Sequence, residues 1–255
     1  IVQTDALSVR WTQVDDIRRR IETACGFPGS SIMVSATHNH AGPAVSATGM
    51  VRRDEAYIES LTQKCVEVFL SALEGTQESE VGFGHTSNFE VGKNRRVVLR
   101  DGTVSTHGSF SDPRALHIEG PMDPEVAVLG ARTPDGRPIG CIVNYACHPT
   151  HYGGGLEFSA GYPGVLRAEM KKRGYPVTLF LNGACGNIHT TNPIDGSEIS
   201  MEDAGRSLAS SAEAALDGAV FTDQWRFGAQ SETVELTYRE LTDGETQGTI
   251  RGAQR

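Results

Sequence analysis

The sequence has no long hydrophobic run, and it opens on neither a methionine nor a secretory signal. No apolar segment approaches the ~20 residues that a membrane-spanning helix needs. The first residues lack the basic and apolar regions of a signal peptide, and residues 1–3 form part of an expected strand. We therefore expect a soluble chain whose native N-terminus is missing, with cytoplasmic and exported locations both open.

Cysteine is scarce, and the basic residues form no block. Five cysteines in 255 residues, with no C-x-x-C pair, exclude the disulfide framework of a small secreted scaffold. Cys147 and Cys185 are expected to be reduced and packed in the core, because free cysteine is among the most buried residue types. A net charge of −9 without Lys/Arg clusters argues against a nucleic-acid partner. The absence of G-x-S-x-G disfavours a serine hydrolase.

What the sequence does contain is ordinary globular composition with alternating apolar patterns. Helical spacing and helix-end residues predict helices at about 12–25, 54–74, 163–173 and 201–216. Apolar runs predict strands at 1–3, 31–34, 125–131, 139–145, 177–181 and 233–236. The turn sequence T-P-D-G-R joins two of them as a hairpin. The prediction is a single α/β domain over 1–255, with a mixed, largely parallel sheet, helices on both faces and an antiparallel hairpin.

Three of these strands end in polar loops broken by glycine or proline. The loops read T-H-N-H-A-G-P, A-C-H-P-T-H and N-G-A-C-G-N. Ligands of open α/β sheets bind at the carboxyl ends of strands, so we expect the three loops to meet. On an extended chain His38 and His40 would point to one face, and His148 also follows a strand. Imidazole nitrogens suit Zn²⁺, although a half-buried histidine bonded to a carbonyl is the alternative for each.

Other residues near these loops offer polar contacts. Asn94-Arg95-Arg96 presents a guanidinium fork to a carboxylate or carbonyl, or else forms a solvated basic turn. The backbone N–H groups of the glycine loop at 183–187 are expected to help hold an oxyanion.

Several segments together resemble the neutral/alkaline, non-lysosomal ceramidase family. The matching pieces are S-A-T-H-N-H-A-G-P, N-R-R, D-P-E-V-A-V-L, N-Y-A-C-H-P-T, F-S-A-G-Y-P-G and L-N-G-A-C-G-N, in order from residue 1 to about 236. The resemblance implies the N-terminal part of a zinc amidase domain in which His38 and His148 bind Zn²⁺. It also implies that His40 lines the substrate site and that Arg95 contacts the substrate. In the family, a Glu and a Tyr much nearer the C-terminus complete the zinc site, at positions that would lie beyond Arg255. The domain is therefore expected to be incomplete at both ends.

Two positions depart from the family pattern. His189 stands where characterised ceramidases carry an active-site serine, and Gly161 stands where they carry an aspartate. Both changes fit a ceramidase-like relative, of lipid or sphingolipid metabolism, that acts on an amide or ester other than ceramide or that has lost activity.

The resulting hypothesis is a zinc-dependent hydrolase that cleaves an N-acyl amide, from a small molecule or a lipid, with metal-activated water. The expected catalytic residues are His40, Arg95 and His189, and the expected substrate contacts are Asn94, Asn182, Gly183 and Asn187. Two alternatives stay open. One is another metallohydrolase, although the H-x-H-x-D-H of metallo-β-lactamases is replaced here by Ala41-Gly42-Pro43 after the pair. The other is a non-catalytic ceramidase-like binding domain.

Overall fold

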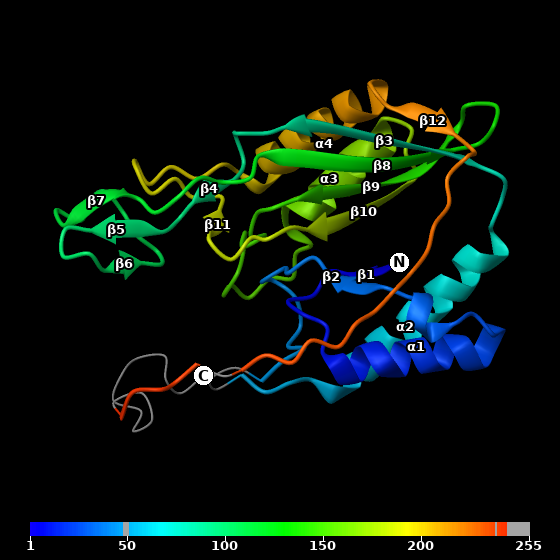
Figure 1. Cartoon of the computed structure of the whole chain (residues 1–255), viewed down its shortest axis with the longest axis horizontal. Helices are drawn as coiled ribbons and strands as arrows, with labels where there is room; N and C mark the ends of the chain where they lie inside the picture. Colours follow the sequence, from blue (N-terminus) through cyan, green and yellow to red (C-terminus); the bar gives the residue numbers. More distant parts are fainter. Residues whose placement is uncertain (48–50, 238, 244–255) are drawn as a thin grey trace.

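The computed structural model describes residues 1–47, 51–237 and 239–243. Its main sheet has the strand order β10-β9-β8-β3-β12 (Figure 1). The strands are β3 (Glu80–Ser87), β8 (Glu125–Arg132), β9 (Pro138–Tyr145), β10 (Val177–Asn182) and β12 (Val220–Thr222). No helix within the described residues is long and apolar enough to cross a bilayer.

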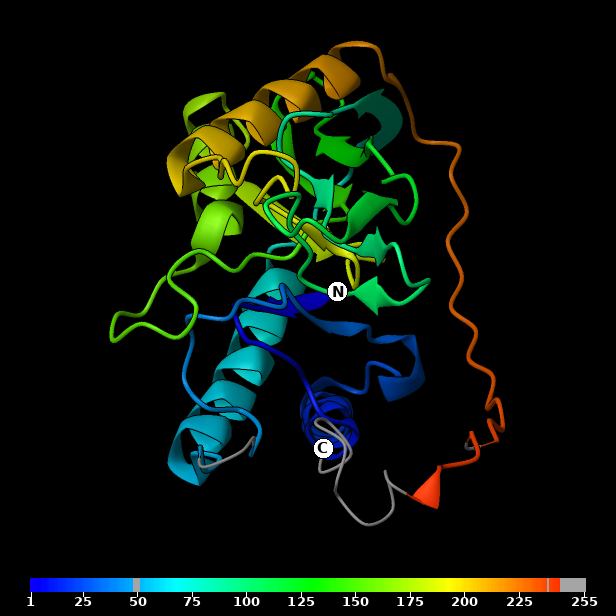
Figure 2. The ribbon, with the colours of Figure 1, turned by 90° about the vertical axis from the view of Figure 1, so that its left-hand side faces the viewer.

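Two helices, α3 (Gly161–Lys172) and α4 (Met201–Asp217), cover one face of this sheet (Figures 1 and 2). Alternate strand residues point toward them, and Val143, Phe180, Leu166 and Leu208 are completely buried in the shared core. β3 presents glycine to α4 instead of side chains. A Cβ on Gly84 would overlap the carbonyl oxygen of Ala215, so the helix lies directly against the strand backbone.

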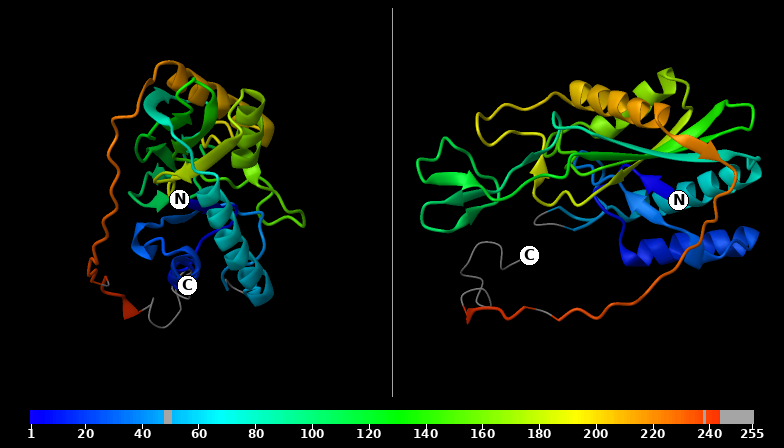
Figure 3. Two further views of the ribbon diagram at one scale, coloured as in Figure 1. Left: turned by 90° about the vertical axis from the view of Figure 1, so that its right-hand side faces the viewer. Right: turned by 45° about the horizontal axis from the view of Figure 1, so that its top comes forward.

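A second layer is built from the N-terminal residues. Strands β1 (Val2–Thr4) and β2 (Val34–Ala36) pair in parallel and pack against α1 (Trp11–Cys25) and α2 (Glu55–Glu74), with the short 3-10 turn η1 (Gly29–Ser31) before β2. This pair lies beside β10, where the Gln3 side chain donates to the carbonyl of Phe180. α1 and α2 thus lie on the opposite side of the strands from α3 and α4 (Figure 3).

The mixed α/β fold and its antiparallel hairpin, formed by β8 and β9, are confirmed. The balance of pairing differs from the prediction, because only β9–β10 is parallel in the main sheet and its other three pairs are antiparallel. Continuous apolar runs suggested parallel strands buried on both faces. Here the apolar content of β8 and β9 reflects a face packed on α3 and α4 and an opposite face that is half-buried.

The expected strand at 233–236 is absent, and those residues are exposed without regular structure. The sheet is completed instead by β12, whose three residues pair with β3. Small sheets extend from one end of the molecule (Figure 1), and the sequence analysis did not predict them. They are β4 (Lys93–Asn94) with β11 (Ile188–His189), and β5 (Val97–Leu99) with β6 (Val104–Ser105) and β7 (Ala115–Ile118).

Candidate metal centre

The three polar loops meet, as their positions after β2, β9 and β10 predicted. Asn182 links them, because its amide N–H donates to the carbonyl of Thr37 at 3.2 Å and its Oδ1 accepts from the N–H of Cys147 at 3.3 Å. The N–H of Gly183 donates to Tyr145 O at 3.0 Å. The parallel pairing of β9 with β10 brings two of the loops together, and Asn182 ties the third to them.

His38 follows β2 in a left-handed backbone conformation, with φ of 66°. The extended arrangement expected for His38 and His40 is therefore wrong. The conformation is uncommon for a residue with a Cβ and costs of order 1 kcal/mol. Neighbouring backbone bonds hold it, since the N–H groups of Thr37 and Asn39 donate to Thr4 and Ala6. The His38 Nδ1–H donates to the carbonyl of Leu7 at 2.8 Å.

His148 lies in the loop after β9 and is 7% exposed. Its Nδ1 is 2.6 Å from the carbonyl of Cys185 and 3.1 Å from that of Ile188. Carbonyls only accept hydrogen bonds, so the proton of each neutral ring, His38 and His148, lies on Nδ1 and the lone pair on Nε2. Zinc-binding histidines are oriented in this way by backbone carbonyls.

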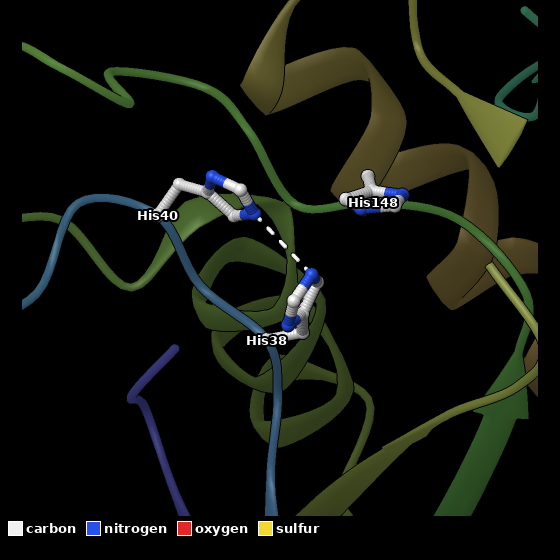
Figure 4. Close-up of side chains that lie close together, drawn as sticks. All are labelled: His38, His40 and His148. Carbon is white, nitrogen blue, oxygen red and sulfur yellow. Dashed lines mark hydrogen bonds between the residues drawn. The ribbon is translucent and has the colours of Figure 1, made fainter. Parts of the chain in front are cut away.

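His40 completes a cluster with these two residues (Figure 4). The ring centroids of His38 and His148 are 4.8 Å apart, and one ligand nitrogen from each of the three rings lies within 4.8 Å of the others. The two Nε2 atoms of His38 and His40 are 3.3 Å apart. Two nitrogens bound to one tetrahedral zinc at roughly 2.0–2.1 Å would be separated by about that distance. The His38 and His40 nitrogens are therefore spaced to share one zinc ion, and the His148 nitrogen lies within 4.8 Å of both.

Two histidines of the cluster, His40 and His148, favour the neutral state. The pKa of His40 is lowered to about 4. The main cause is desolvation of its ring, and the second is the charge of the neighbouring His38. Burial and the charge of Arg95 lower the pKa of His148. Neutral imidazole is the form that binds metal, so these shifts favour binding near neutral pH.

Acid should destabilise the metal-free protein before its carboxylates titrate. Burial also lowers the pKa of His189 to about 4, as it does for His40, whereas both would titrate near 6.5 in the unfolded chain. The unfolded state therefore binds protons first, and stability present above about pH 6.5 falls as the pH drops toward 4. Urea unfolding at pH 7.0, 6.0 and 5.2 checks this, and a His189→Asn protein should show a smaller decrease. Equal free energies of unfolding at pH 7.0 and 5.2 would contradict it.

Arg95 lies between β4 and β5 and rests on the glycine loop. Its backbone N–H donates to Asn187 O, and its Nη2 donates to Gly186 O, both at 2.8 Å. Its Nε is buried and has no partner among the described residues. The positive charge of Arg95 contributes to the lowered pKa of both His40 and His148.

The residues expected to touch substrate mostly form hydrogen bonds with the protein's own backbone. Asn94 is buried, with its amide N–H groups on the carbonyls of Gly120 and Pro121 and its Oδ1 on the N–H of Arg96. Asn182, Gly183 and Asn187 hold the bonds described above, and the N–H of Gly183 is not free for an oxyanion. Substrate contact by these four residues remains a prediction, whereas their role in positioning the loops is visible.

His189 lies on β11 with its ring centroid 6.5 Å from that of His148. Both of its ring nitrogens have partners, Thr150 at Nε2 and Thr191 at Nδ1. Sequence reasoning named neither Thr150 nor the Leu7 carbonyl that holds His38. The sequence could have indicated Thr150, because it stands in the same H-P-T stretch as His148.

A cavity of about 600 Å³ adjoins His40. Apolar side chains dominate its wall, and they come from the segment before α1, the loop after His40 and the glycine-rich loop after His151. They include Leu7, Val45, Leu156 and Phe158. The cavity gives an apolar group access to the cluster.

Comparison with solved structures places this arrangement in a known fold. The chain superposes on a neutral ceramidase from Pseudomonas aeruginosa with a TM-score of 0.66 and 18% identity, over 85% of this chain and 36% of that one. The fold is that of the neutral ceramidases. A ceramidase complexed with C2 gives a TM-score of 0.67 and 17% identity, over 85% of this chain and 35% of that one. The chain thus spans about a third of the length of these ceramidases. No protein-family model and no curated protein matches its sequence.

Proposed function

We propose that this chain carries part of the zinc site of a ceramidase-like hydrolase that cleaves the amide bond of an N-acyl substrate. The observation that carries the proposal is that His38, His40 and His148 each bring one ring nitrogen within 4.8 Å of the others, while backbone carbonyls accept from Nδ1 of His38 and of His148. The ceramidase-like fold around the cluster supports the reaction class. The same fold makes a metallo-β-lactamase site a poor fit.

His38 and His148 would hold the zinc ion, with His40 within reach of the same position. Bound there, zinc lowers the pKa of a water molecule to about 7 and polarises a carbonyl. The protein's own groups would position the substrate. Arg95, whose guanidinium is held by Gly186 O through Nη2, would orient the scissile carbonyl. His40, whose lowered pKa leaves it neutral, is the group that would take up a proton and pass it to the leaving amine.

The substrate class proposed is a small-molecule or lipid amide with an apolar acyl group. The cavity beside His40 would accept that group, because its wall is mostly apolar. Turnover of long-chain ceramide is expected to be poor. The family resemblance puts His189 where ceramidases carry a serine, and a bulky ring that is bonded at both nitrogens would leave no hydroxyl there.

Hydrolysis of a short N-acyl amide is expected to require about one zinc ion per chain. Treatment with 1,10-phenanthroline should remove the metal and the activity together, and added ZnCl₂ should restore both, because the water needs the ion to ionise near neutral pH. Metal content by mass spectrometry of the eluted protein and amine release report the two quantities. Hydrolysis that survives loss of zinc would contradict the proposal. Zinc-bound protein that binds but never cleaves N-acyl amides would favour the non-catalytic alternative.

A further inference from the structure

A chain of hydrogen bonds runs beside the histidine cluster through Thr191, His189 and Thr150. The Nε2 of His189 is 2.7 Å from the hydroxyl oxygen of Thr150. Its Nδ1 is 3.1 Å from both the backbone nitrogen and the hydroxyl oxygen of Thr191. None of these contacts is required to form β11, whose two residues pair with β4 through the backbone.

The direction of each bond in this chain follows from its donors. The backbone N–H of Thr191 only donates, so Nδ1 of His189 accepts and the ring proton lies on Nε2. Nε2–H therefore donates to the Thr150 hydroxyl oxygen. The hydroxyl hydrogen of Thr150 has no acceptor within the part of the chain that the structure describes. It is thus available to a group outside the protein.

The position of Thr150 places this hydroxyl beside the histidine cluster. Thr150 lies two residues after His148 on the loop that follows β9. The same loop closes on His40, whose N–H donates to Pro149 O at 3.3 Å. A Cβ on Gly153 would lie 2.9 Å from the Cβ of His40, so the loop packs directly against that residue. Thr150 therefore lies in the short loop between His148 and Gly153, which packs on His40.

We propose that Thr150, positioned by the Nε2–H of His189, donates its hydroxyl hydrogen bond to the carbonyl oxygen of the bound amide. The assignment rests on the proposed function, and it needs no proton transfer or covalent step. A donor aimed at the oxygen where negative charge develops stabilises the transition state more than the substrate. Thr150 is then a catalytic residue. His189 acts through it and is a positioning residue.

Four single variants and one double variant separate the two roles. Thr150→Val removes only the hydroxyl and should lower kcat for a short N-acyl amide about 100-fold, the usual loss for one oxyanion donor. Thr150→Ser should rescue most of that loss. His189→Leu should lower kcat about tenfold, and His189→Gln should restore part of it, because its amide N–H reaches the position of Nε2–H. In the Thr150→Val background, His189→Leu should add less than about twofold, since the two residues act together.

Measurements other than activity accompany these variants. Zinc content should be unchanged in all of them, and Thr23→Val, on an exposed helix face, is the matched control for a threonine substitution. Nitrogen NMR of the metal-free protein should show the His189 proton on Nε2. A proton on Nδ1, full activity in Thr150→Val, or additive losses in the double variant would overturn the inference. A zinc-bound wild-type protein without amidase activity would overturn the proposed function, and the NMR result would still decide the Thr150–His189 pairing.

Discussion

Replacing His148 with alanine is expected to abolish zinc binding and to reduce amide hydrolysis by more than about 100-fold. Removing a residue that only hydrogen-bonds to a metal ligand costs about 10–100-fold, and removing a ligand itself should cost more. The reason is geometric. Loss of the imidazole removes one of the two nitrogens whose lone pairs are aimed by backbone carbonyls. Titration calorimetry with ZnCl₂ measures the first effect, and amine release from a short N-acyl amide measures the second. His38→Ala should behave in the same way.

His117→Ala is the control for this comparison. His117 is exposed on β7, where its ring bonds only to the neighbouring backbone, and its replacement should leave zinc binding unchanged. A His148→Ala protein that binds zinc with wild-type affinity would show that the ion lies elsewhere. Equal losses in the His117 and His148 variants would point to a general effect of removing histidine.

Gly84→Ala is expected to destabilise the fold by about 3 kcal/mol, at the upper end of the cost of overpacking. A Cβ at this position would overlap the carbonyl oxygen of Ala215 and lie 2.7 Å from its carbonyl carbon. Both are backbone atoms of α4, so no side-chain rotation relieves the clash and the helix must move off the sheet. Urea unfolding followed by circular dichroism measures the change.

Gly228→Ala is the matched control for the glycine substitution. A Cβ at Gly228 meets no atom within 4 Å, and its backbone is not left-handed, so stability should change by less than about 0.5 kcal/mol. Identical unfolding midpoints for the Gly84 and Gly228 variants would contradict the close contact between β3 and α4.

Much of the fold could be predicted because its signals are local. The helix α2 has apolar residues at helical spacing, with Asp54 as its N-cap and Gly75 after it, and both ends agree with the structure. The hairpin turn at 133–137 is equally local. β12 was missed because three residues are too few to show periodicity, and because an edge strand is defined by its backbone pairing with β3. The segment at 233–236 has a strand-like pattern but no partner strand in the structure.

The site was predictable only in part. The positions of His38 and His148 at strand ends, together with the family resemblance, indicated that they meet. Their tautomers depend on the carbonyls of Leu7 and Cys185, which lie 31 and 37 residues away in the chain. The left-handed backbone at His38 and the Thr150–His189 bond also arise from tertiary packing. Sequence patterns therefore identified the candidate ligands, whereas the hydrogen bonds that orient their side chains required the structure.

The most direct test of the metal centre is anomalous scattering at the zinc edge from crystals grown with ZnCl₂. A strong peak is expected at roughly 2.0–2.1 Å from the Nε2 atoms of both His38 and His148, with the Nδ1 atoms still on their carbonyls. The absence of a peak between these two residues, or coordination through either Nδ1, would contradict it.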